Sequence, residues 1–123
     1  MVASAPLNKK RFSLKRHERL RRRNDFDLAF RHGSRRHTKN FTIILRPNEL
    51  QFSRLGVTVG KKVGKAVKRN RVKRYLREFF RLHKHKLPAS YDMVIVAKKD
   101  AATLAYHDVR EELAAMLLGN NCL

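Results

Sequence analysis

The spacing of apolar positions changes several times along the chain, and each change marks an expected element. The segment NDFDLAFRHG, residues 24–33, places two phenylalanines four residues apart between a candidate N-cap, Asn24, and a terminal glycine, which predicts a short helix. The segments 41–46 (FTIILR) and 53–60 (SRLGVTVG) have the β-branched content and the alternation of strands. Proline and asparagine between them predict that the two strands form a hairpin.

The second half of the chain contains the longest expected element. A 3.6-residue apolar period predicts a helix from about residue 65 to about residue 84, ahead of Pro88. A continuous apolar run within residues 91–99 predicts a strand covered on both faces, and residues 105–118 predict a final helix. The resulting order, α-β-β-α-β-α, predicts an α+β fold, an α/β sandwich in which helices pack on a mixed sheet of about four strands or fewer.

The length of 123 residues suits one domain, which we place at residues 20–119. Residues 1–19 are basic and poor in apolar positions, and they predict an arm that is disordered when free; residues 120–123 form a tail. The single cysteine, Cys122, can close no internal disulfide, which favours a cytoplasmic protein. The apolar runs are far shorter than the roughly 20 residues of a membrane-spanning helix.

The net charge of the chain limits the kinds of partner that we expect. Thirty Lys and Arg face ten Asp and Glu, giving a net charge of +20, and such self-repulsion indicates an anionic partner: nucleic acid, an anionic membrane or an acidic protein. A membrane-surface helix would need its apolar stripe free, whereas here that stripe is needed for a core. Sequence patterns of zinc fingers, Walker loops, helix-turn-helix pairs and basic zippers are absent, so RNA is favoured over duplex DNA.

The long helix divides into two faces. At about 100° per residue, one stripe gathers Val72, Leu76, Phe79, Phe80 and His83 and is expected to face the core. The opposite face and the turns before it are almost entirely basic, with Glu78 as the sole acid between residues 61 and 81, so charge pairing cannot explain the pattern. We predict an RNA-binding ridge about 30 Å long, made of Lys61, Lys62, Lys65, Lys68, Arg69, Asn70, Lys73, Arg74, Arg77 and Arg81.

The acidic residues and the histidines argue against catalysis by the protein. The acidic residues are dispersed over different expected elements, not clustered as two-metal nucleases require. His83 and His85 form an H-x-H whose rings should point in different directions on a helix, so we expect no metal site. Phe26, Phe30, Phe41 and Tyr91 could stack on unpaired bases, and each could equally be a core residue.

The run GKKVGKAVKRNRVKRYLREFFR, residues 60–81, resembles the signature of the protein component of bacterial ribonuclease P, with its R-N-R-x-K-R core at residues 69–74. The segments LRRRNDFDLAFRHG, RLGVTVGKK and LPASYDMVIVAKKDA resemble the first helix, second strand and third strand of that family, in the same order. The resemblance covers residues 20–118 and is specific in its motif set.

The resemblance implies a protein cofactor that is a noncatalytic subunit of an endoribonuclease. It would bind the catalytic RNA and the 5′ leader of precursor tRNA, and so promote 5′-end maturation of tRNA. The RNA would carry the chemistry and most of the required Mg²⁺, and we expect no tightly bound cofactor, small-molecule substrate or membrane contact. A ribosomal-type structural RNA-binding protein or RNA chaperone is the alternative. The resemblance also implies a left-handed strand-helix-strand crossover, against the usual rule.

By motif, the resemblance adds Arg71 to the RNA-facing residues and assigns a leader cleft to Phe26, Phe30, Thr42 and Ile44. Thr42 and Ile44 lie where family members can present an aromatic residue. Gly60 replaces the usual serine before the paired lysines, which implies a looser corner between strand and helix.

Overall fold

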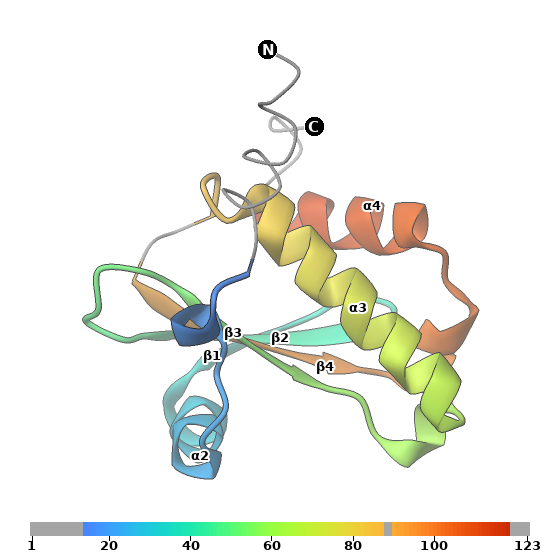
Figure 1. Ribbon diagram of the computed structural model, residues 1–123, viewed down its shortest axis with the longest axis horizontal. Coiled ribbons are helices and arrows are strands. Elements are labelled where there is room, and N and C mark those ends of the chain that lie inside the picture. Colours follow the sequence, from blue (N-terminus) through green and yellow to red (C-terminus); the bar gives the residue numbers. More distant parts are fainter. Residues whose placement is uncertain (1–13, 88–89, 119–123) are drawn as a thin grey trace.

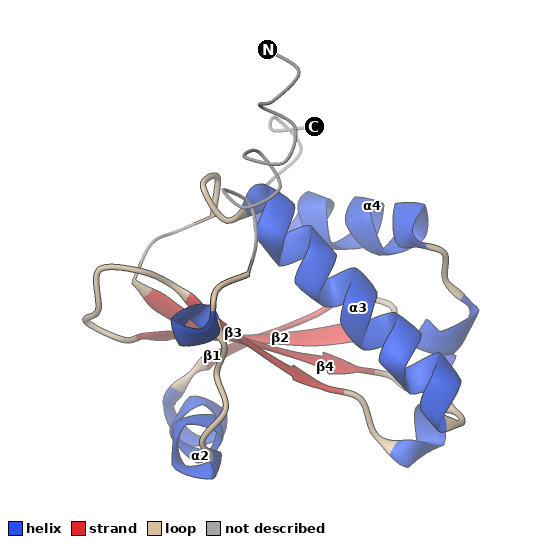
Figure 2. Ribbon diagram, in the orientation of Figure 1, coloured by secondary structure: helices blue, strands red, loops and turns tan. Residues whose placement is uncertain are grey.

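The computed structural model describes residues 14–87 and 90–118 and confirms an α+β fold, with helices on both faces of one sheet (Figures 1 and 2). The helices and strands, in chain order, are α2 (Arg23–His32), β1 (Ser34–His37), β2 (Phe41–Pro47), β3 (Arg54–Thr58), α3 (Ala66–His83), β4 (Tyr91–Ala97) and α4 (Tyr106–Leu117). Three short 3₁₀ turns complete them: η1 (Arg16–Glu18), η2 (Lys61–Val63) and η3 (Lys99–Thr103).

The sheet has the strand order β1-β2-β4-β3, and this corrects the predicted hairpin. β2 and β3 are not neighbours, because β4 lies between them, antiparallel to β2 and parallel to β3. β4 carries the most continuous apolar run, so it takes a central position where both faces are covered. β3, α3 and β4 thus form the parallel crossover that the resemblance implied, and its hand stays a prediction.

β1 is a strand that the sequence analysis missed. Its residues, SRRH, are all exposed and polar, so no apolar alternation marks them. β1 pairs with β2 in antiparallel register, from Ser34 opposite Leu45 to His37 opposite Thr42. The hairpin at this end of the chain therefore joins β1 to β2.

The first helix begins earlier than expected. Its N-cap is Arg22, and Asn24 lies inside the helix, because the amides of Asp25 and Phe26 already bond to the carbonyl of Arg22. The helix ends before Gly33, as expected. A Cβ on Gly33 would lie 2.5 Å from Cγ2 of Ile44, so glycine is needed here for close packing on β2.

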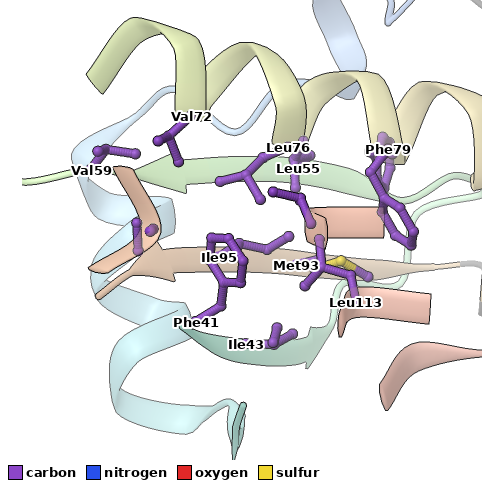
Figure 3. Packing of buried hydrophobic residues seen from close by; sticks show 14 of the residues in the cluster. Phe41, Ile43, Leu55, Val59, Val72, Leu76, Phe79, Met93, Ile95 and Leu113 are labelled. Carbon is purple, nitrogen blue, oxygen red and sulfur yellow. The ribbon is translucent and has the colours of Figure 1, made fainter. Parts of the chain in front are cut away.

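The larger core confirms the expected apolar stripe of α3. Val72, Leu76 and Phe79 are buried against one face of the sheet (Figure 3). Phe80 is buried in the same cluster. The sheet and α4 contribute Phe41, Ile43, Leu55, Met93, Ile95, Val109 and Leu113 to the same cluster. His83 stacks on Phe79 with 4.4 Å between ring centroids, so this histidine serves packing.

A smaller core lies on the other face of the sheet, beneath α2. Leu20, Ala29, Ile44 and Val94 are its buried members, with Phe26, Phe30 and Val96 packed around them. A Cβ on Gly56 would lie 2.7 Å from the Phe26 ring, so the helix sits directly on bare backbone of β3. This close approach fixes α2 on the sheet.

The N-terminal segment is part of the packed domain from residue 14 onward, which corrects the arm boundary at residue 19. The Glu18 carboxylate lies 2.9 Å from Nζ of Lys84, beyond the last turn of α3. The amide of Leu20 donates to the carbonyl of Leu55 at 2.8 Å, which adds the segment to the free edge of β3. The rest of the arm and the predicted tail, with Cys122, lie outside the described residues. Of the helices that are described, none is long and apolar enough to cross a membrane.

Candidate nucleic-acid interface

The basic residues of α3 form a ridge on the side away from the core, as the periodicity predicted. Six of the predicted RNA-binding residues are exposed and five are half-buried. The exposed ones are Lys61, Lys62, Lys65, Lys68, Asn70 and Arg74, and the half-buried ones are Arg69, Arg71, Lys73, Arg77 and Arg81. α3 can present this surface because its opposite stripe is buried from Val72 to Phe80.

The corner before α3 is held by a 3₁₀ turn and by one glycine with a positive φ angle. Gly60 has an ordinary extended backbone (φ −80°), and a side chain there would meet nothing within 4 Å, so it makes no special demand. Gly64 has φ +151°, a conformation that favours glycine. Arg69 Nε donates to the Gly64 carbonyl at 3.1 Å, so the conformational constraint at the corner lies at Gly64.

The arginines of α3 do not all point the same way. Arg71 donates to the carbonyl of Ala102 at 3.2 Å and so leans toward η3, on the flank of the ridge. Arg74 lies over the ring of Tyr75, 5.6 Å from its centroid, and remains exposed. Arg81 is paired with Glu78, the single acid of the helix. Arg74 is therefore the arginine best placed to contact a phosphate along the exposed row.

Arg77 has an unfavourable environment for a cation. Burial lowers the pKa of its guanidinium, and the positive charge of Arg19 lowers it further. Arg19 comes from the N-terminal segment, and it meets Arg77 because that segment is docked beside α3. Because the positive charges of Arg19 and Arg77 are held close to each other, binding of an anion beside them would be favourable.

An open groove, here called the arginine groove, lies between the N-terminal segment, β3 and α3. Its volume is about 620 Å³, and its lining consists of Leu14, Arg16, Arg19, Leu20, Arg21, Leu55, Val57 and Arg77. A hollow of about 400 Å³ shares three of these residues and adds Arg74, Glu78 and Arg81 of the ridge. The arginines of the N-terminal segment were missed as site residues because the segment was predicted to be a free arm. Leu14 and Leu20, which flank them, were the signal that it could pack.

The predicted leader residues lie on the α2 face of the sheet, where one is buried and three are half-buried. Ile44 is fully buried and belongs to the smaller core, so it can only support a surface from beneath. Phe26 is half-buried against Gly56. Phe30 and Thr42 are also half-buried. Phe41, a candidate for base stacking, is fully buried on the opposite face of the sheet and is a core residue.

β1 adds two residues that the sequence analysis did not identify on this face. Arg35 lies over the Phe30 ring, 5.7 Å from its centroid, and donates to the Phe30 carbonyl at 2.8 Å. Nδ1 of His37 lies 3.1 Å from Oγ1 of Thr42. Phe30, Arg35, His37 and Thr42 are here called the leader face. It combines an aromatic ring, a cation and hydrogen-bonding groups, as single-stranded RNA recognition requires.

The buried and half-buried acids serve the fold. Asp92 is fully buried and bonded to Arg54 and Asn48, while Glu112 bonds to Thr38 and Asn40 and joins α4 to the turn before β2. Within residues 14–87 and 90–118, no group of three or more His, Cys, Asp or Glu side chains could hold a metal ion.

Comparison with known proteins agrees with this geometry. The family model described as Ribonuclease P matches residues 14–119. A ribonuclease P protein component from Syntrophus aciditrophicus is 50% identical over 108 residues, which cover 88% of this chain and 91% of the relative. A structure of the RNase P protein from Thermotoga maritima aligns with a TM-score of 0.76 and 39% identity, covering 80% of this chain and 96% of that one. The Staphylococcus aureus RNase P protein aligns with a TM-score of 0.76 and 29% identity, covering 82% and 92%.

The family match spans nearly all of the chain, and the relatives are matched over nearly their whole length. The matched region contains α3 with its basic ridge, the sheet and the docked N-terminal segment. The comparisons do not favour the alternative of a ribosomal-type structural protein or RNA chaperone. This chain belongs to the family of bacterial ribonuclease P protein components.

Proposed function

We propose that this protein is the RNA-binding cofactor of a ribonuclease P whose RNA subunit cleaves the 5′ leader from precursor tRNA. The observation that carries the proposal is the ridge of α3, where basic side chains line one face of an 18-residue helix that has one acid. A cationic row of this length can follow successive phosphates of an RNA backbone. The catalytic RNA is the partner we assign to the ridge.

The precursor tRNA is the partner we assign to the leader face. Phe30 offers a half-exposed ring for an unpaired base, and Arg35 beside it offers a charge for the adjoining phosphate. This face lies on the opposite side of the sheet from α3, so the protein could contact both RNAs at once (Figure 1). Mg²⁺ would be bound mainly by the RNA, and the assembly would act in the cytoplasm.

Reconstitution tests the proposal directly. Purified protein is incubated with precursor tRNA at low Mg²⁺, with and without a bacterial ribonuclease P RNA, and the released leader is quantified. We expect no cleavage by the protein alone and faster cleavage when protein is added to the RNA. Cleavage by the protein alone would contradict a noncatalytic role, and an unchanged rate of the RNA-catalysed reaction would contradict the cofactor role.

Replacing Phe30 by Ala should weaken binding of precursor tRNA to the holoenzyme while leaving mature tRNA binding unchanged. Loss of one base-aromatic stack costs about 1–3 kcal/mol, which corresponds to roughly a 5- to 150-fold weaker affinity for the precursor. Titration of both tRNAs against the assembled holoenzyme measures the difference.

The matched comparison is Phe26→Ala, on the same helix. Phe26 packs on Gly56, so we expect this change chiefly to lower the free energy of unfolding. If Phe30→Ala weakens both tRNAs equally, Phe30 does not contact the leader.

A further inference from the structure

The arginine groove is formed by a different part of the chain from the ridge, and its position is fixed by specific contacts. The Glu18 carboxylate accepts two bonds from Lys84, at 2.9 and 3.1 Å, and ties η1 to the end of α3. Leu20 is 5% exposed and holds the other end of the segment on β3. Arg16, Arg19 and Arg21 therefore project from a backbone that is held at both ends.

The groove carries charge that the protein does not neutralise. Among the described elements that line it, η1, β3 and α3 have two acids, and both are paired: Glu18 with Lys84 and Glu78 with Arg81. Elsewhere in the described structure the half-buried Arg54 has two carboxylates beside it. Arg77 is similarly half-buried, yet the charged neighbour that affects it is Arg19, another cation. An anion from outside the protein would balance this arrangement.

The shape of the groove indicates a polymer in preference to a small anion. The groove is open, and the hollow next to it shares Arg19 and Arg77 and continues to Arg74 and Arg81 on the ridge. Leu55 and Val57 give the groove an apolar wall, which suits the ribose between two phosphates. A chain of alternating sugars and phosphates fits such a continuous track.

We propose that the arginine groove binds the sugar-phosphate backbone of the catalytic RNA, as an extension of the ridge on α3. The proposal rests on the proposed function, and it adds the N-terminal segment as a second element of the RNA-binding surface. The groove opens beside α3, whereas the leader face is on the α2 side of the sheet. The catalytic RNA, not the leader, is thus the strand within reach.

The test is the variant Arg16→Gln/Arg19→Gln, in the full-length protein. Both side chains are exposed, and neither donates a side-chain bond within the described structure, so the fold should be retained. Binding to ribonuclease P RNA is measured between 50 and 200 mM salt. Two lost phosphate contacts should lower the slope of log K against log salt by about two, so that affinity falls about tenfold less over this range than for the unmodified protein.

The matched control removes two charges from the opposite edge of the sheet, with Arg36→Gln/Lys39→Gln. It should change the slope by much less than one. The charge-preserving variant Arg16→Lys/Arg19→Lys should keep most of the original slope, which separates loss of charge from loss of fold.

Three results would overturn the proposal. In the first, the Gln variant keeps the original slope. In the second, the control loses as much as the groove variant, which would mean that only net charge matters. In the third, precursor tRNA binding falls while catalytic RNA binding does not. Failure of the unmodified protein to bind the RNA would reject the proposed function as well, whereas a slope change for ridge variants alone would reject only the groove.

Discussion

Replacing Asp92 by Ala is expected to lower the free energy of unfolding by about 3–5 kcal/mol, because it leaves two half-buried arginines without their carboxylate. Asp92 is 0% exposed. Its two oxygens accept bonds from Nε and Nη2 of Arg54, both at 2.8 Å, and Asn48 donates a third at 2.9 Å. The bond to Asp92 raises the pKa of Arg54, so the arginine stays charged under any ordinary condition.

The position of Asp92 explains the size of this effect. Asp92 lies at the start of β4, opposite Arg46 of β2 and Arg54 of β3, so one carboxylate joins three strands. Arg54 also reaches Asp25 of α2 at 3.5 Å. Without Asp92, the half-buried Arg54 keeps only that longer contact.

Urea unfolding, monitored by far-UV circular dichroism, measures the change in the free energy of unfolding. In thermal unfolding, the melting temperature should fall by roughly 10–20 °C. Asp100→Ala is the matched control, because Asp100 is an exposed acid on η3 and its removal should cost less than about 0.5 kcal/mol. A loss below about 1 kcal/mol in Asp92→Ala would show that the network does not hold the three strands together.

The elements that the sequence predicted best are those whose signal is local. The apolar positions of α3 repeat with the helical period between Val72 and Phe80, so both the helix and its buried stripe follow from periodicity alone. The basic ridge follows in turn, because a helix that buries one face exposes the other. β4 could be predicted as a covered strand for a similar reason, namely its unbroken apolar run.

The features that the sequence did not predict depend on contacts between distant residues. The order of the strands is decided by which strand buries most apolar surface, and the turn at Pro47 and Asn48 is compatible with either pairing. β1 has no apolar pattern, and it forms a strand because its backbone pairs with the edge of β2. The arginine groove depends on the pair Glu18 and Lys84, which are 66 residues apart.

The double variant Arg69→Ala/Arg74→Ala should weaken binding to ribonuclease P RNA by about five- to thirtyfold at 0.15 M salt, and lower the salt slope by about one to two units. Arg74 is exposed on the ridge, whereas Arg69 is half-buried and bonded to Gly64. If both contact phosphate, the slope falls by the full two units; if Arg69 serves only the corner, it falls by one. The single variants separate these cases, and an unchanged slope in a folded protein would exclude both from the interface.

Combining this change with Arg16→Gln/Arg19→Gln tests whether the ridge and the groove hold one RNA. Independent phosphate contacts contribute additively to the slope, so the quadruple variant should lose about three to four units. Arg77 lies between the two sets and lines both the groove and the adjoining hollow. A quadruple variant that loses no more than either pair alone would mean that the RNA already leaves the protein surface when one set is removed. In that case RNA binding at the ridge and RNA binding at the groove would depend on each other, and Arg77 would lie where the two sites adjoin.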